Sequence, residues 1–156
     1  MIEPLEDGDT ETVEVVFRQL GPQTRRWRFG APKPRLSPDE LALLARVGCG
    51  RLALVARAGE HPIGLAHLVC EPETRSAEVA VVVADRWQRL GAGSALADGL
   101  AAEAAAVGIL RVHALIAADN SASLALMRAA TTIVETRFEA SSVHVIGRVP
   151  AREHQW

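Results

Sequence analysis

Residues 76–94 read SAEVAVVVADRWQRLGAGS, and this stretch decides how the chain folds. Its valine-rich part, 76–84, favours a buried β-strand. A short loop leads from it into Gly91-Ala92-Gly93 and a helix expected over 94–107, which Gly108 can end. The amides in the first turn of that helix have no partner within it, so the sequence predicts a place for a phosphate group there.

The patterns on either side of this stretch predict the other elements. Apolar residues at helical spacing behind Asp9 predict a helix over 9–20 that stops at Gly21-Pro22, and Ser37 caps a second helix over 37–47. A further helix is expected over 122–130. The strands are expected at 51–57, 63–70, 76–84, 111–118, 133–140 and 143–149. This order predicts an α+β fold with an antiparallel meander, one β-α-β crossover and a closing hairpin.

The composition limits the classes of protein and partner. The 156 residues suit a single domain, expected over 1–150 with a C-terminal tail over 151–156. A net charge of −2 gives no general attraction to nucleic acid or to an anionic membrane, so we expect neither as a partner. The acidic N-terminus lacks the apolar core of a signal peptide, so we expect a cytoplasmic protein. Cys49 and Cys70 have no metal-binding spacing, and no metal site is expected.

The glycine-rich turn is compatible with more than one kind of site. A lone Gly-x-Gly also occurs in tight turns that bind nothing. A Walker loop is excluded, because the chain has no GxxxxGK[ST] and its one lysine is Lys33. A Rossmann dinucleotide site fits poorly, because Leu96 replaces the third glycine and the preceding strand ends a meander.

The loop and the order of elements resemble the GNAT acetyltransferase superfamily. Gln88-Arg89-Leu90-Gly91-Ala92-Gly93 matches the Q/R-x-x-G-x-G/A pyrophosphate loop of that family. The run from about 76 to 130 resembles its core, Asn120 resembles the Asn before its last core helix, and the resemblance extends over about 5–150. The stretch 22–39 is also similar to the catalytic domain of bacterial protein lysine acetyltransferases.

The resemblance implies a fold, a cofactor and its binding residues. The fold is a mixed, mostly antiparallel sheet of about six to seven strands with about four helices, and a parallel pair splays at the cofactor site. The cofactor is acetyl-CoA, a form of coenzyme A. Its pantetheine arm would bind the backbone of Val81, Val82 and Val83, whose side chains also suit a core. The other implied cofactor-binding residues are Gln88, Arg89, Leu90, Gly91, Ala92, Gly93, Ser94 and Asn120.

The resemblance also points to a catalytic base. Several family members carry a glutamate near the position of Glu78, and a carboxylate there can take the proton that an amine must lose. A surface charge at a strand edge is the alternative. Glu135 and Glu139 are further candidates for the base, and His67 is either a hydrogen-bonded core histidine or a catalytic one.

Two departures from the family pattern leave the function open. Met127 stands where many members carry a tyrosine that protonates the CoA thiolate, and Thr131-Thr132 replaces the usual Gly-Phe. One hypothesis is an N-acetyltransferase that acts by direct transfer in a ternary complex. The other is a non-catalytic module that binds acyl-CoA or regulates a partner.

The acceptor side of the expected site is less determined. The implied acceptor is a primary amine of a small molecule or a protein, and a homodimer is one expectation because dimers are common in the family. Arg25, Arg26, Trp27 and Arg28 either rim the acceptor entrance or form a solvated basic turn with the tryptophan packed inward.

Overall fold

A mixed seven-stranded sheet with the strand order β1-β2-β3-β4-β5-β7-β6 forms the centre of the molecule. The computed structural model describes residues 1–151. The sheet carries one parallel pair, β4 with β5, and its other neighbours run antiparallel. The strands are β1 (Ile2–Pro4), β2 (Arg51–Ala58), β3 (His61–Glu71), β4 (Ser76–Val83), β5 (Arg111–Ala117), β6 (Thr132–Glu139) and β7 (Ser142–Arg148).

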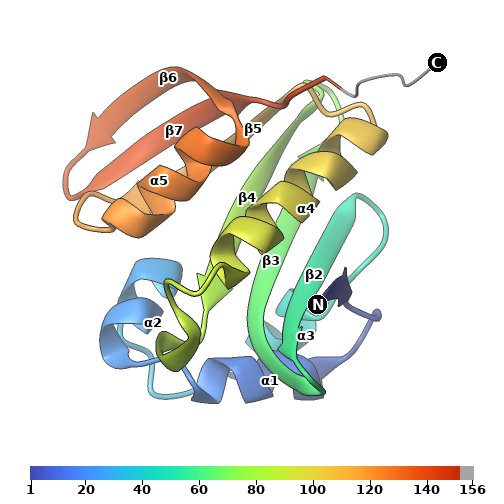
Figure 1. The fold of residues 1–156 in the computed structure, drawn as a ribbon, viewed down its shortest axis with the longest axis vertical. Coiled ribbons are helices and arrows are strands. Elements are labelled where there is room, and N and C mark those ends of the chain that lie inside the picture. Colours follow the sequence, from blue (N-terminus) through green and yellow to red (C-terminus); the bar gives the residue numbers. More distant parts are fainter. Residues whose placement is uncertain (152–156) are drawn as a thin grey trace.

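Helices cover both faces of this sheet, as Figure 1 shows. They are α1 (Thr10–Arg18), α2 (Pro22–Phe29), α3 (Pro38–Leu44), α4 (Ala92–Ala106) and α5 (Ser121–Ala130). Successive strand residues point to opposite faces, so β4 contributes to two cores. Ala77 and Val83 pack with α4 and α5, whereas Val82 packs with α1 and α3. The α+β fold with a parallel pair at its centre is therefore confirmed.

The local signals for helix ends act as the sequence predicts. Asp9 caps α1, and Asn120 caps α5 by accepting from the Ser123 amide at 3.2 Å. Ser37 and Glu40 form a capping box at the start of α3, where Pro38 takes the first helical position. The meander over β2, β3 and β4 and the hairpin of β6 with β7 are also confirmed.

Three features of the structure depart most from the prediction. Gly21-Pro22 does end α1, but it also begins α2, because Gly21 is the N-cap and Pro22 occupies the first turn. The segment 22–29, where a basic turn was an alternative, is thus a helix. The short edge strand β1 was missed, and α4 begins at Ala92 rather than at 94. The tail was predicted over 151–156, and its residues beyond 151 lie outside the described residues.

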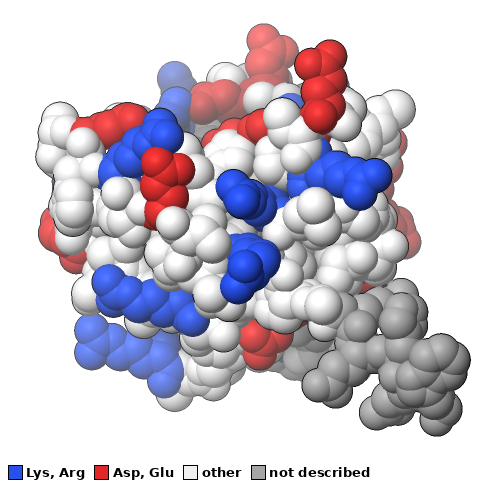
Figure 2. Space-filling model, turned by 90° about the horizontal axis from the view of Figure 1, so that it is seen from above, with Lys and Arg blue, Asp and Glu red and all other residues white. Residues whose placement is uncertain are grey.

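Surface charge and helix length complete the description of the fold. On the face that Figure 2 presents, basic and acidic side chains are interspersed among uncharged ones. None of the helices within residues 1–151 combines the length and the apolar character needed to cross a bilayer.

His67 on β3 is the core histidine that its alternation with apolar neighbours indicates. Its Nε2–H donates to the Leu44 carbonyl oxygen at 2.9 Å, and its Nδ1 is buried without a hydrogen-bond partner in the described structure. Burial, followed by the positive charge of Arg28, lowers the pKa of His67 to about 4. The imidazole therefore stays neutral in the folded protein at pH values where a free histidine takes up a proton.

We expect this histidine to make the fold sensitive to acid. Between pH 6.5 and pH 4, His67 binds a proton in the unfolded chain but stays neutral in the folded protein. The free energy of unfolding therefore falls as pH falls. The loss attributable to His67 amounts to about 3 kcal/mol across that window. His67→Gln keeps an amide donor for Leu44 but cannot titrate, so denaturant unfolding at pH 7 and pH 4.5 should show a smaller decrease than in the wild type. An equal decrease in both proteins would contradict this role.

Candidate active site

The parallel strands β4 and β5 separate soon after they begin. Their pairing runs from Ser76 with Arg111 to Glu78 with His113, and no further pair joins them. β4 continues to Val83 beside β3, while β5 continues to Ala117 beside β7 (Figure 1). The divergence opens a cleft of about 700 Å³, bordered by α2, α4 and α5 as well as by the two strands.

The backbone of β4 faces this cleft along its unpaired edge. Residues from Val79 to Val83 pair with β3 on one side only, and all of them line the cleft. In an antiparallel pair every second residue directs its N–H and C=O away from the partner strand. The strand therefore offers hydrogen-bonding groups to a ligand, while the Val82 and Val83 side chains are buried in the two cores.

The far end of the cleft is the N-terminus of α4. Gly91 is the N-cap with φ of 96°, a left-handed conformation that glycine adopts without strain, and no side chain caps the helix. The first backbone bond of the helix runs from the Ala95 amide to the Gly91 carbonyl. The amides of residues 92–94 thus precede the first intrahelical bond, and the helix dipole adds positive potential beside them. This end of the cleft suits a phosphate group.

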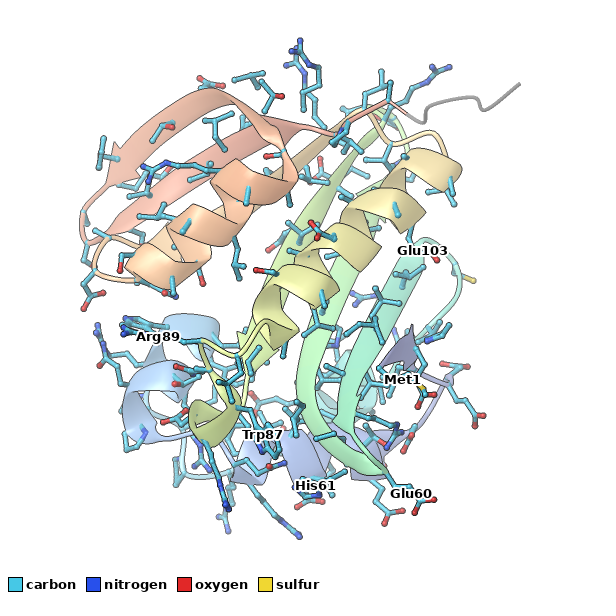
Figure 3. All side chains as sticks on the ribbon, viewed as in Figure 1. Met1, Glu60, His61, Trp87, Arg89 and Glu103 are labelled. Carbon is cyan, nitrogen blue, oxygen red and sulfur yellow. The ribbon has the colours of Figure 1, made fainter. Side chains whose placement is uncertain are left out.

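The residues predicted for this loop take different positions. Five of them line the cleft: Gln88, Arg89, Gly91, Gly93 and Ser94. Leu90, which is 71% exposed, and Ala92 are not among the residues that line it. In Figure 3 the labelled Arg89 lies on the open side of the molecule, between α5 and α2.

Two of these loop residues also stabilise the fold. The Gln88 side-chain amide donates to the Val83 carbonyl at 3.0 Å and to the Thr24 hydroxyl at 3.2 Å, so it fixes the loop against β4 and α2. A Cβ on Gly93 would lie 3.2 Å from a methyl group of Leu126, so the glycine allows α4 to approach α5 closely.

Glu78 lies where the splay begins. It is exposed, lines the cleft and is the last residue of β4 that pairs with β5. Its partner in the register is His113, whose Nε2–H donates to the Glu71 carboxylate at 2.5 Å. The Nδ1 of His113 lies 3.4 Å from Nε2 of His144. The hydrogen bond from His113 lowers the pKa of Glu71. The base of the splay is therefore a polar cluster that the strands bring together.

The other candidates for a base lie apart from this point. Glu135 forms an ion pair with Arg137 at 2.7 Å on the edge strand β6, and Glu139 ends the same strand. Neither residue lines the cleft, and neither does His67.

Asn120 acts as a helix cap at the edge of the cleft. It is buried, and its side chain donates to the Ser123 hydroxyl at 2.9 Å in addition to capping α5. The Met127 side chain is also buried and lines the cleft. Thus no tyrosine hydroxyl occupies this wall. Ser123 and Thr131, each four residues from Met127, line the cleft too, and the Thr131 hydroxyl donates to the Met127 carbonyl at 2.7 Å.

The contacts of Asp119 are a feature of the site that the sequence did not reveal. Its carboxylate accepts from the indole of Trp27 at 3.0 Å and from the Arg26 guanidinium at 3.0 Å. These bonds lower the pKa of Asp119, with the Trp27 bond contributing most. They hold α2 against the loop between β5 and α5, so Trp27 closes one side of the cleft instead of packing into the core. Arg26 and Trp27 are distant from Asp119 in sequence, so no local sequence signal indicates that these residues are in contact.

The cleft fits the acyl-CoA cofactor that the resemblance implies. Its unpaired strand edge offers the kind of backbone group that bonds the amides of a pantetheine arm, and its uncapped helix end suits a diphosphate. The residues that would hold these groups are the ones named above on β4 and in the loop.

Comparisons with known proteins agree with this geometry. Residues 20–130 match the model of the acetyltransferase (GNAT) family. The GNAT domain of PAT from S. lividans superposes with a TM-score of 0.84 at 27% identity, covering 94% of this chain and 89% of that one. A cAMP-binding acyltransferase from Mycobacterium smegmatis superposes with a TM-score of 0.64 at 26% identity, and the match covers 96% of this chain and 43% of that one.

A more distant structure has the same fold. The ribosomal-protein-S18-alanine N-acetyltransferase from Escherichia coli gives a TM-score of 0.70 at 18% identity, covering 100% of this chain and 98% of that one. The sequence matches no curated protein. The family match spans more than half of the chain and includes the loop, the splayed strands and the helix that borders them, so this chain belongs to the GNAT acetyltransferase family.

Proposed function

We propose that this protein is an N-acetyltransferase that moves an acetyl group from acetyl-CoA to a primary amine by direct transfer in a ternary complex. The observation that carries the proposal is the continuous cleft between β4 and β5, which runs from Glu78 at the base of the splay to the uncapped amides of α4. One end supplies a carboxylate and the other a site for phosphate, as the reaction requires.

The chain would bind the cofactor mainly through its backbone. The amides around Gly91, Gly93 and Ser94 would hold the diphosphate, with the Arg89 cation beside them. The free N–H and C=O groups of Val81, Val82 and Val83 would bond the pantetheine arm. An amide of this strand would also donate to the thioester carbonyl oxygen and stabilise the charge that develops there.

Glu78 would act as the base that makes the acceptor amine reactive. An alkylamine with a pKa near ~10.4 is protonated at neutral pH, and only its neutral form is nucleophilic. Acetyl-CoA supplies an activated acyl carbon in its thioester. The ammonium group first gives one proton to Glu78, directly or through water. The neutral nitrogen then bonds to that carbon, the carbon–sulfur bond breaks with its electron pair on sulfur, and the nitrogen loses its second proton to water.

The leaving thiolate needs little help from the protein. A thiol pKa of about 8.5 makes thiolate a tolerable leaving group, so a proton from solvent can complete the step without a tyrosine. This accounts for Met127 at the position of the usual acid. No cysteine is required as a nucleophile: Cys49 and Cys70 do not line the cleft, which supports direct transfer over a covalent intermediate.

A second candidate function is a module that binds acyl-CoA without transferring the acyl group. The buried Met127 in the wall of the cleft is the observation that favours it. Such a protein would keep the backbone contacts to the cofactor and lack transfer to any amine.

The test is thiol release from acetyl-CoA, measured across a panel of small amines, amino acids and lysine-containing peptides. We expect release that depends on both the amine and the protein, and a product whose mass has gained one acetyl group. The control without amine should give only slow hydrolysis. Tight acetyl-CoA binding in calorimetry with no transfer to any amine would instead support the non-catalytic module.

A further inference from the structure

The structure separates the three arginines of α2 by what each of them contacts. Arg25 turns inward: its guanidinium lies 4.1 Å from the ring centroid of Phe17 and donates to the carbonyls of Lys33 and Phe17 at 2.9 Å and 3.1 Å. Arg26 forms the ion pair with Asp119 at 3.0 Å. Both cations are therefore engaged in holding α2 in place.

Arg28 differs from both of its neighbours. Within residues 1–151 it makes no side-chain hydrogen bond and no ion pair, although it is partly buried. Its guanidinium lies 5.0 Å from the centroid of the Phe29 ring, on the wall of the cleft that also contains Glu78. Burial lowers the pKa of Arg28, and the charge of Glu78 acts in the opposite direction. The two groups are thus close enough to interact but not paired.

A guanidinium in this position is suited to an anion that comes with the substrate. It carries five N–H donors in a planar fork that matches a carboxylate in two parallel bonds. Leaving such a charge partly buried without a partner is costly, and the cost is recovered when a ligand supplies one. Arg28 also borders a small apolar pocket with Phe29 and His67, which offers it no anion, whereas in the cleft it shares the lining with Glu78.

We infer that the acceptor is an amine that bears a carboxylate close to its nitrogen, with the amine at Glu78 and the carboxylate on Arg28. This inference rests on the proposed function and names its class of substrate. A free amino acid and a peptide with an acidic residue beside its amine share this chemistry. Arg28 acts as a specificity-determining residue and takes no part in the proton transfer.

The experiment compares acceptors that differ only in this carboxylate. One arm uses an amino acid and its carboxamide, and the other uses lysine peptides with Glu or Gln beside the lysine. In the wild type we expect kcat/KM to be at least ~10-fold higher for the carboxylate member in one of the two arms, which identifies the source. In Arg28→Gln that preference should disappear while kcat/KM for the neutral member changes little.

Two further variants keep the result interpretable. Arg28→Lys retains the positive charge without the planar fork, so it should show part of the preference that Arg28→Gln loses. A preference that returns with lysine would show that the loss in Arg28→Gln does not come from misfolding. Arg35→Gln removes the same charge from an exposed position outside the cleft, and its preference should equal that of the wild type. Thermal unfolding and acetyl-CoA titration of each variant report whether the fold and the cofactor site are intact.

The outcomes separate this inference from the proposed function. The same preference in the wild type and in Arg28→Gln would overturn it, as would weaker acetyl-CoA binding by Arg28→Gln with the preference unchanged, since the anion would then be a cofactor phosphate. If no amine is acetylated, the proposed acetyl transfer is wrong. The carboxylate site at Arg28 is then supported only if calorimetry in the presence of CoA shows that the wild type binds an amine bearing a carboxylate and that Arg28→Gln does not.

Discussion

Replacing Glu78 by glutamine should lower kcat/KM at pH 7 by at least ~100-fold with the best amine of the panel, because general-base catalysis contributes about that much. The amide is similar in size and keeps hydrogen-bonding capacity, but it cannot take the amine proton. The variant then depends on the small fraction of acceptor amine that is already neutral. As long as the pH is below the amine pKa, this fraction increases about tenfold for each unit by which the pH is raised. The deficit should therefore be much smaller at pH 9, as a pH–rate profile would reveal.

The chain provides a matched control for this loss. Glu135→Gln makes the same change on β6, at a residue that is paired with Arg137 and does not line the cleft. We expect its rate to stay within a factor of about two of the wild type, as for a surface ion pair. Acetyl-CoA affinity should be unchanged in both variants. A loss in Glu78→Gln that does not depend on pH, or no loss at all, would remove Glu78 as the base.

Gly91→Glu should abolish acetyl-CoA binding while the fold survives. Position 91 has φ of 96°, and a Cβ there meets nothing within 4 Å, so the cost to the fold is mainly the left-handed conformation, about 1–2 kcal/mol. The new carboxylate would lie at the start of α4, where it competes for the free amides and repels the diphosphate. We expect the affinity measured by calorimetry to fall by at least ~100-fold.

Gly108 at the other end of α4 provides the control. It has φ of 81°, and a Cβ there also meets nothing within 4 Å, so Gly108→Glu introduces the same charge and the same kind of strain away from the cleft. This variant should bind acetyl-CoA as the wild type does and lose similar stability in thermal unfolding. Equal affinities for the two variants would mean that the loop does not bind the diphosphate.

Much of the fold could be predicted because its signals are local. The valine run before the loop, Gly91 and the cap residues Asp9, Ser37 and Asn120 each act within a few positions of themselves. The error at Gly21-Pro22 has the same origin, since the pair signals the end of one helix and the start of the next with the same residues. The strand β1 is too short to give a periodic pattern.

The sequence by itself determined the order of the elements from α3 to β7, the loop before α4 and the glutamate on β4, because backbone preferences and burial patterns are encoded by neighbours along the chain. Only the tertiary structure decided that Glu78 lies where the splay begins, that Asp119 holds α2 over the cleft, and that Arg28 alone among the α2 arginines lacks a partner within residues 1–151. These contacts join residues that are far apart in sequence. The distances between those residues depend on how β4 and β5 diverge, and the spacing of residues along the chain does not specify that divergence.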